Sequence, residues 1–264
     1  MPELFNSDAG QVAIRKHIIE SDYLEAVVAL PTNMFYNTGI PTFIWIITNR
    51  KPEHKKGKVQ LINATSERYY SKMKKSLGDK QNEMTAKHIE NIVTLFLDYV
   101  QEGDALVLDN KDFGYTEITI EKPKRIEELL KDEKFNKIAN KEKIIERLSA
   151  LEATPQEFLS REDFIAYLGV KLTKSEMKLL IDSNKTNNVE KIPLKIDIQS
   201  YYDKEVKPYV LNSWIDWESK SVGYEILFNK YFYTYTPPRE LHEINQELQA
   251  LEEEIKDLLY KITE

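Results

Sequence analysis

Two apolar runs in the first fifth of the chain set the pattern from which the fold is predicted. Residues 26–30 and 43–47 are each continuously hydrophobic, and neither run alternates with polar residues. Such runs are typical of strands buried on both faces, as in an α/β sheet that is covered by helices. The polar loop between them carries two adjacent aromatic residues, Phe35 and Tyr36, followed by Asn37. Because ligands bind at loops that follow the strands of such sheets, we expect this loop to carry function.

A helix and a third strand complete the predicted sheet. Ile14, Ile18 and Ile19 form one apolar face of a helix that ends near residue 21. A basic turn around Gly57 then leads to the third strand. A sheet of about three strands would leave an apolar edge exposed. We expect this edge to pair with a partner chain, to self-associate or to be covered by helices of the same chain. The three strands are expected at about 25–30, 42–49 and 59–63.

Beyond residue 66 the pattern becomes mainly helical. Thr85 begins a helix whose apolar residues fall on one side. Ser160 and Thr173 each stand three residues before an acidic side chain, which is the spacing of helix N-caps. One short alternating strand is expected near 115–121. Helices are expected at about 124–132, 140–151, 155–168 and 173–182.

The end of the chain carries an unbroken heptad pattern after Pro237 and Pro238. Its apolar positions recur at alternating spacings of three and four residues, and charged residues fill most positions between them. The helix either packs on its own domain or forms a coiled coil with another chain. The seam consists of Leu241, Ile244, Leu248, Leu251, Ile255, Leu258 and Ile262.

The predicted fold class is therefore α/β followed by mainly α. We expect an α/β part at residues 1–65 and a mainly helical domain at 66–236, with a short β element near 115–121. A long coiled-coil-type helix is expected at 237–264.

The net charge of −7 is unevenly distributed along the chain. Residues 1–125 hold 17 basic and 17 acidic side chains, so the whole acidic excess lies in the second half. Within the first half, residues 50–75 hold nine basic side chains against Glu53 and Glu67. A local excess of this kind can face phosphates even on an acidic protein. The alternative is a solvated loop whose lysines keep the protein soluble.

Several classes of chemistry lack the residues that they need. The chain has no cysteine, so it has no disulfide, thiolate metal site or cysteine nucleophile. The eight glycines are too far apart for a phosphate-binding P-loop, and the four histidines form no closely spaced pair for a metal. No apolar stretch is long enough to span a membrane, and no secretory signal begins the sequence. These features are typical of a cytoplasmic protein, and the residues by themselves show no catalytic constellation.

Residues 30–46 follow the pattern L-P-x-x-x-F-Y-N-T-G-I-P-T-x-I-W-I. Together with its surroundings from Arg15 to Lys51, this pattern resembles the methylation subunit of type I restriction–modification systems. These subunits are adenine-specific DNA methyltransferases that use S-adenosylmethionine. The resemblance continues at residues 112–115, 121–123, 203–216 and 223–239. It is weakest at residues 126–200.

The resemblance implies that the chain is the C-terminal portion of such a subunit, beginning late in a Rossmann-like methyltransferase sheet. The family's cofactor site and its catalytic motif, Asn-Pro-Pro followed by Phe or Tyr, would precede this portion. No such tetrapeptide occurs in the sequence, and residues 236–239 are only superficially similar to it. We therefore expect no catalytic residue here, and neither S-adenosylmethionine binding nor methylation by this chain alone. A sequence that starts with Met1-Pro2 at this point of the family pattern would be expected from a reinitiated, split or truncated reading frame, or from a deliberately shortened gene. The sequence does not distinguish these origins.

The resemblance also gives the first loop a role, because a target adenine must leave the duplex before it is methylated. We hypothesise that Phe35 or Tyr36 stacks on the extruded base while the other packs inward, and that Asn37 hydrogen-bonds the base edge. The alternative is that both aromatic residues only seal the end of the sheet. Contacts to the DNA backbone are expected from Arg50, Lys51, Lys55, Lys56 and Lys58.

The partners that the resemblance implies are DNA, the specificity subunit, the restriction subunit and the missing N-terminal methyltransferase portion, with no membrane. The heptad seam would dock on the long helices of the specificity subunit. An alternative from another functional class is a non-catalytic interaction or scaffold module of the same complex.

Overall fold

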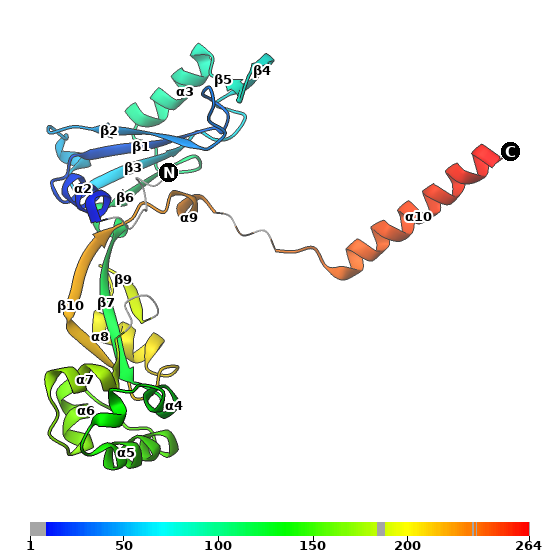
Figure 1. Ribbon diagram of the computed structural model, residues 1–264. Coiled ribbons are helices and arrows are strands. Elements are labelled where there is room, and N and C mark those ends of the chain that lie inside the picture. Colours follow the sequence, from blue (N-terminus) through cyan, green and yellow to red (C-terminus); the bar gives the residue numbers. More distant parts are fainter. Residues whose placement is uncertain (1–8, 184–187, 234, 236, 264) are drawn as a thin grey trace. The chain divides into compact units, whose positions relative to one another are not determined.

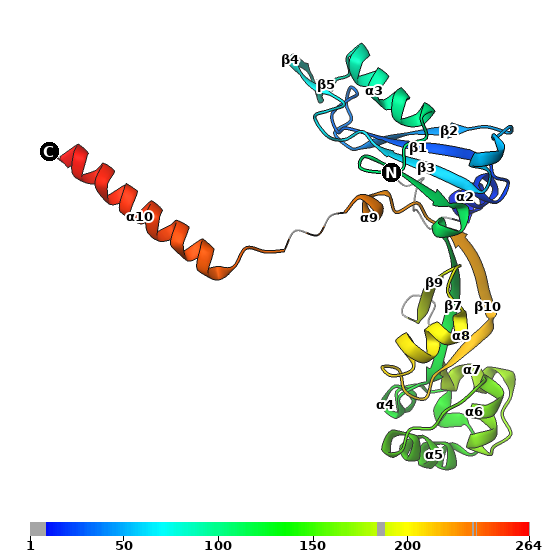
Figure 2. The same ribbon diagram turned by 180° about the vertical axis from the view of Figure 1, so that it is seen from behind.

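The computed structural model describes residues 9–183, 188–233, 235 and 237–263. The fold is mixed α/β, with two larger sheets, one separate hairpin and several helices (Figures 1 and 2). The chain divides into two compact units, Met1–Phe228 and Asn229–Glu264, and each is described by itself.

The first sheet has the strand order β2-β1-β3-β6. Strands β1 and β3 are parallel, whereas β2 runs antiparallel to β1 and β6 antiparallel to β3. The three strands predicted from the sequence are present, and β6 is a fourth that the prediction lacked. Its four apolar residues form a run too short to distinguish from a buried helix segment by pattern alone. The bounds are α2 (Ala9–Glu20), β1 (Leu24–Leu30), β2 (Thr42–Ile47), β3 (Lys58–Asn63) and β6 (Ala105–Asp109).

The two apolar runs differ in burial. Every residue of β1 except Glu25 is buried, which confirms the prediction for the first run. For β2 the prediction of burial on both faces is wrong, because Ile44 and Ile47 are about half exposed and no residue of the strand is fully buried. Among the described residues, β2 pairs only with β1 and forms one edge of the sheet. An edge strand is covered from fewer sides than a central one, so the same composition leaves apolar surface here.

Helix α3 (Ala86–Leu97) covers one face of this sheet (Figure 1). Its start is confirmed, since the Thr85 side chain accepts a hydrogen bond from the backbone N–H of His88 in a capping box. Ile92 and Phe96 pack against buried residues of β1 and β3. The opposite side of the apolar band is exposed, and it consists of Ile89, Val93 and Leu97. The hairpin of β4 (Ser71–Leu77) and β5 (Lys80–Glu83) precedes this helix.

The second sheet is built on a long antiparallel ribbon of β7 (Gly114–Pro123) and β10 (Trp214–Tyr224) (Figures 1 and 2). Strands β8 (Ile181–Asp182) and β9 (Val189–Pro193) also pair with β7. At the end of the ribbon a Cβ on Gly223 would lie 2.5 Å from the Tyr115 ring, so a larger residue there would displace that ring. The expectation of one short strand in a mainly helical region is therefore corrected. The centre of β10 is polar and irregularly paired, so it does not show the alternation by which a strand is recognised.

Short helices gather around a core that contains Trp214 at one end of the ribbon. Ser160 and Thr173 are the N-caps of two of them, since they accept hydrogen bonds from the backbone N–H groups of Asp163 and Glu176. The helix expected from about residue 155 therefore begins only at Arg161, after the cap at Ser160. The helices around this core are α4 (Ile126–Leu130), α5 (Lys141–Ala153), α6 (Arg161–Leu168) and α7 (Lys174–Leu180), whereas α8 (Ile198–Tyr201) packs against a separate core formed with β7, β9 and β10. The first unit also contains four short helical turns, which are η1 (Glu53–Lys55), η2 (Asn110–Phe113), η3 (Phe135–Lys137) and the π-helix η4 (Tyr202–Val206).

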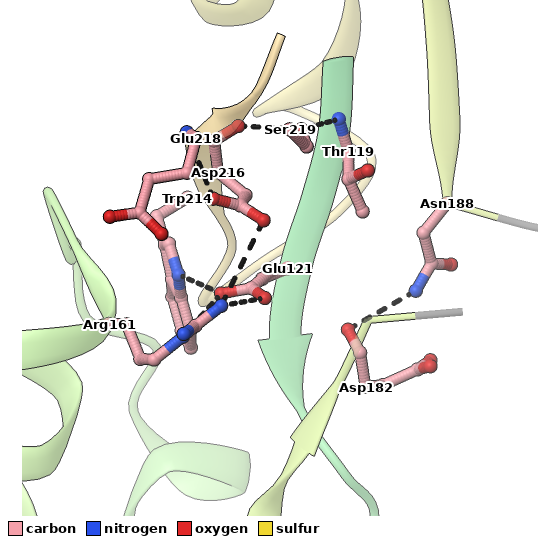
Figure 3. A network of polar contacts seen from close by, with 9 residues as sticks. All are labelled: Thr119, Glu121, Arg161, Asp182, Asn188, Trp214, Asp216, Glu218 and Ser219. Atoms are coloured by element: carbon pink, nitrogen blue, oxygen red, sulfur yellow. Dashed lines mark hydrogen bonds and ion pairs between the residues drawn. The ribbon is translucent and has the colours of Figure 1, made fainter. Parts of the chain in front are cut away.

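A buried carboxylate joins α6 to the ribbon (Figure 3). Glu121 of β7 is 1% exposed and accepts hydrogen bonds from Arg161 Nη2 at 2.6 Å and Arg161 Nε at 3.1 Å. The indole Nε1 of Trp214 donates to the same carboxylate at 2.9 Å. The hydrogen bond to Glu121 raises the pKa of Arg161 above its usual value, although burial opposes this shift. One side chain thus connects β7, β10 and α6.

The second unit contains the long helix α10 (Leu241–Thr263), and α9 (Phe228–Phe232) lies at the boundary between the units. The seam residues Leu241, Leu248, Leu251, Ile255 and Leu258 are exposed, and the side chain of Ile262 lies outside the described residues. Whether the seam forms a coiled coil stays a prediction, and so does the division of the chain at residues 65 and 236. Of the helices that the structure describes, none is long and apolar enough for a membrane span.

Candidate nucleic-acid interface

The loop singled out in the sequence, residues 31–41, connects the carboxyl end of β1 to β2. We call it the aromatic loop. The carboxyl end of β3 lies at the same edge of the sheet, because β1 and β3 are parallel and pair over Ala26 to Ala29. The backbone N–H of Ala64, just after β3, also donates to the carbonyl of Ala29 at 3.0 Å. The carboxyl ends of parallel strands are the edge at which sheets of this class bind ligands.

The aromatic loop folds into a tight turn with Tyr36 and Asn37 at its tip. A β-bridge between Phe35 and Thr38 closes this turn. Asn37 has φ of 53° and Asn33 has φ of 57°, a left-handed conformation that asparagine tolerates better than most residues. These asparagines therefore allow the chain to turn sharply twice.

Both aromatic side chains of the loop face solvent. Phe35 is 49% exposed and Tyr36 is 62% exposed, and Asn37 is exposed beside them. The idea that one of the aromatic pair packs inward is wrong, because Met34 occupies the buried position. The structure thus brings Phe35, Tyr36 and Asn37 together on one accessible turn.

The β4–β5 hairpin holds the aromatic loop in place through four hydrogen bonds. The carbonyl of Asn33 accepts from the backbone N–H groups of Gln81 at 3.0 Å and Asn82 at 3.1 Å. The side chain of Asn33 donates to the carbonyl of Asp79 at 2.9 Å, and that of Asn82 donates to the carbonyl of Thr32 at 2.8 Å. The loop and the hairpin lie side by side in both views (Figures 1 and 2). Such bonding lowers the conformational freedom of the loop before any ligand binds.

The same hairpin carries four lysines, and one of them lies near the aromatic turn. Lys72, Lys74 and Lys75 are exposed on β4, and Lys80 Nζ lies 5.9 Å from the centre of the Tyr36 ring. The lysines of β4 belong to the basic excess between residues 50 and 75, for which the sequence left open a phosphate-facing surface or a solvated loop, but they were not among the five residues named as DNA-backbone contacts. The signal that could have found them is the Gly78-Asp79 dipeptide, which is typical of a two-residue hairpin turn and would have placed them on its strands.

The five basic residues expected to contact the DNA backbone lie at the opposite end of β1. Leu24 at the start of β1 pairs with Ile47 at the end of β2, so the segment from β2 to β3 leaves from that end. Seven strand residues span roughly 23 Å, which separates this segment from the aromatic loop. The sequence neighbours therefore do not come together with Phe35 and Tyr36.

Two of these five are already paired inside the protein. The Lys51 side chain is 3% exposed, with Nζ 2.5 Å from Asp22 Oδ1. The Lys55 side chain is 9% exposed, with Nζ 2.9 Å from Glu25 Oε1 and over the ring of Phe96. Charges neutralised in this way are not available to a phosphate. Arg50, Lys58 and Lys56 are exposed, the last in a surface pair with Glu53, but their position at the far end of β1 does not support a contact to a nucleic acid held at the aromatic loop.

The segment after β3 is fastened by Tyr69. Its hydroxyl donates to Asp104 Oδ2 at 2.7 Å, and Arg68 Nη1 lies 3.2 Å from the same oxygen. Burial, together with this hydrogen bond, raises the pKa of Tyr69 to about 12. The hydroxyl therefore stays protonated in the physiological range and acts as a donor that anchors the segment.

The chemistry that the described side chains offer at this edge is stacking, hydrogen bonding and attraction of negative charge. Within the described ranges, no group of three or more potential metal-ligating side chains is present. An S-adenosylmethionine site would need a glycine turn and a carboxylate beside a parallel strand. After β1 the chain continues as Pro31-Thr32-Asn33, and after β3 as Ala64-Thr65-Ser66, so these turns do not fit that cofactor.

Comparison with known proteins relates the chain to DNA methylases. Residues 2–156 match the family model described as N-6 DNA Methylase. The type I restriction enzyme MjaIX methylase subunit of Methanocaldococcus jannaschii is 41% identical over 90 residues, which are 33% of this chain and 15% of that protein. The MjaVII methylase subunit of the same organism is 31% identical over 140 residues, which are 49% of this chain and 24% of that protein. The matched regions thus span less than a quarter of the length of these relatives.

A solved structure is similar at the sequence level. The type I restriction-modification system methyltransferase subunit from Streptococcus thermophilus is 28% identical, and the match covers 42% of this chain and 22% of that chain. The TM-score is 0.36.

Proposed function

Because the chain belongs to the N-6 DNA methylase family, we propose that it forms the distal part of a type I restriction–modification methylase. In this proposal the aromatic loop receives the target adenine after it has left the duplex. One of Phe35 and Tyr36 stacks on the base, and Asn37 hydrogen-bonds its edge.

The observation that carries this proposal is the exposure of two adjacent aromatic side chains on a loop that is held in place. Exposed aromatic residues are costly to hydrate, and a base that stacks on them covers that surface. Stacking contributes about 1–3 kcal/mol per base, which offsets the few kcal/mol needed to unstack it from the duplex. A loop that only sealed the sheet would bury these rings, as it buries Met34.

The methyl donor implied by the family is S-adenosylmethionine, which supplies the methyl group in the complete enzyme. We assign it no residue of this chain, because the turns after β1 and β3 do not fit it. The catalytic Asn-Pro-Pro-Phe/Tyr motif is likewise expected in a preceding portion. Methyl transfer to DNA by this chain alone is therefore expected to be undetectable, and a supplied N-terminal portion should restore it.

The test of base stacking replaces Phe35 and Tyr36 with alanine, singly and together. The full chain should bind a duplex with a mismatched 2-aminopurine more tightly than the paired duplex, because an unpaired base costs less to extrude. The double replacement should remove this preference, which we expect to be about 5- to 100-fold. In a methylase completed by the N-terminal portion, methylation should fall by a similar factor.

The matched control is Ile40→Ala, which shortens another exposed apolar side chain of the same loop. It should leave the mismatch preference unchanged, because an aliphatic side chain offers no ring for stacking. Adenine methylation that is unchanged by both aromatic replacements would contradict the role of the loop.

The heptad seam of α10 supports a second part of the proposal, which is docking to the specificity subunit through helix-to-helix contact. Exposed leucine and isoleucine at a and d positions are suited to such a contact. The remaining alternative is a scaffold module without a role in methylation. It predicts normal assembly together with full methylation after replacement of Phe35 and Tyr36.

A further inference from the structure

The position of the β4–β5 hairpin carries an inference beyond the stacking role of the aromatic loop. We propose that its lysines, Lys72, Lys74, Lys75 and Lys80, bind the phosphate backbone of the nucleic acid whose base the loop receives. This inference rests on the proposed function, and it names a contact site on an element that the family resemblance did not single out.

These four lysines have no charge partner in the described part of the protein. None of its ion pairs involves any of the four, whereas Lys51, Lys55 and Lys56 are all paired. Ammonium groups without an internal partner can neutralise phosphates, and the cations that had condensed on the nucleic acid are then released, which favours binding. The charges of the hairpin lysines are therefore available to phosphates, whereas Lys51, Lys55 and Lys56 after β2 are already paired with carboxylates of the protein.

The hairpin also lies where the phosphates of a bound nucleotide would be. Asn33 bonds to the backbone of Asp79, Gln81 and Asn82, so the hairpin and the aromatic turn form one connected surface. A nucleotide whose base stacks on Phe35 or Tyr36 has its own phosphates only a few bond lengths away. Lys80, next to the Tyr36 ring, is placed to meet them.

Among polyanions, a nucleic acid matches this surface best. Aromatic rings interleaved with lysines are the arrangement with which proteins hold unstacked nucleotides. An acidic polypeptide would use the charges but not the rings. The chain as a whole carries a net charge of −7, so a nucleic acid approaches favourably only at a locally basic surface such as this hairpin.

The experiment compares two triple variants of the full chain that each remove three positive charges. Lys72→Gln/Lys74→Gln/Lys75→Gln changes the hairpin, and Arg50→Gln/Lys56→Gln/Lys58→Gln changes the opposite end of β1. Binding of a short fluorescein-labelled DNA with one mismatched adenine is followed by anisotropy over a series of salt concentrations. Polyglutamate serves as a second probe, and the thermal midpoints of all variants establish that they are folded.

We expect the hairpin variant to bind DNA about tenfold more weakly at low salt. The slope of its salt dependence should be shallower by about 0.7–0.9 for each phosphate that is no longer bound. The opposite-end variant should change binding less than about threefold. Replacement of the same three lysines with arginine should restore binding, because it restores the charge.

Equal weakening by both triple variants would overturn the inference, because it would reflect overall charge and not a local contact. Unchanged binding by the hairpin variant would also overturn it. If Phe35→Ala/Tyr36→Ala still weakened binding in that case, the proposed function would stand without the hairpin contact. Binding of polyglutamate that is as tight as DNA binding and as sensitive to the hairpin variant would identify an acidic protein as the partner instead. Failure of the unaltered chain to bind DNA would overturn both proposals.

Discussion

Asp22 joins three segments that are distant in the sequence, at the amino end of β1. Its carboxylate accepts hydrogen bonds from Lys51 Nζ at 2.5 Å, the backbone N–H of Gly57 at 2.9 Å and Asn110 Nδ2 at 2.9 Å. Burial by itself would raise the pKa of Asp22, but these hydrogen bonds hold it below the usual value of 3.8. The charged form of this side chain therefore stabilises the folded protein.

Replacing Asp22 with asparagine should lower the free energy of unfolding by about 1–3 kcal/mol at neutral pH. Asparagine has the same shape and tolerates the φ of 57° at this position, so the change isolates the charge. Because the folded-state pKa is depressed, the stabilisation is present above the ordinary pKa of 3.8 and is lost as the pH falls through the folded value. Urea unfolding of both proteins at pH 7 and near pH 3 measures the difference.

Glu53→Gln is the control for this prediction, because Glu53 pairs with Lys56 on the exposed surface. It should change stability by less than about 1 kcal/mol. A difference between the protein and its Asp22→Asn variant that persisted undiminished at low pH would contradict the assignment.

At the scale of elements, the buried carboxylate of Glu121 determines how α6 is attached to the β7–β10 ribbon. Arg161 supplies the compensating charge and Trp214 a further donor (Figure 3). A carboxylate that is 1% exposed is stable only while such partners remain. The attachment therefore depends on Arg161 as well as on the apolar packing of Phe164 and Leu168 in the core that contains Trp214.

Arg161→Met should destabilise the protein by about 3 kcal/mol, because it leaves the Glu121 charge buried without its partner. Adding Glu121→Gln should recover part of that loss, since an uncharged amide costs less to bury and still accepts from Trp214. Urea unfolding of the single and double variants measures both effects. Lys207→Met, which removes an exposed ion pair with Glu157, is the comparison and should cost much less stability than Arg161→Met. A double variant as unstable as Arg161→Met, or more so, would contradict this account.

At the scale of the whole molecule, the chain consists of two compact units, and α10 belongs to the second. The core residues of the first unit come from its own sheets and helices. Among the seam side chains that the structure describes, Ile244 is half-buried and the others are exposed, so the second unit by itself gives the seam little apolar surface to pack against.

Deletion of residues 240–264 should therefore shift the thermal midpoint of the remaining protein by less than about 2 °C. The same deletion should weaken assembly with the specificity subunit, as measured by co-purification. A more specific experiment compares two double variants. Leu248→Lys/Leu251→Lys changes the seam, and Gln246→Lys/Gln249→Lys changes the outer side of the helix. Both variants add two charges, and only the seam variant should lose the partner. Equal co-purification of the two would contradict docking through the seam.

The pattern of residues along the chain was sufficient to predict those features that depend on a few neighbouring positions. The strands β1, β2 and β3, the starts of α3 and α7 and the turn that carries Phe35 and Tyr36 lie where the pattern predicts them. Each depends on local backbone preference, on capping hydrogen bonds or on a continuous apolar run.

Other features could not be predicted because they depend on pairing between distant positions. Trp214 of β10 pairs with Glu121 of β7 across more than 90 residues, and nothing near either strand encodes that partner. Likewise, β2 is as apolar as β1 but lies at an edge, because strand order is a property of the whole sheet.

The sequence by itself determined the position and composition of the aromatic loop and the family to which the chain is related. Only the tertiary structure decided which charges accompany that loop. Lys51 and Lys55 are neutralised by Asp22 and Glu25 at the far end of β1, while Lys80 of the β4–β5 hairpin, which has no ion pair in the described part of the protein, lies near the Tyr36 ring. The reason is physical: an ion pair forms between groups that folding brings within a few ångströms, and distance along the chain does not set that separation.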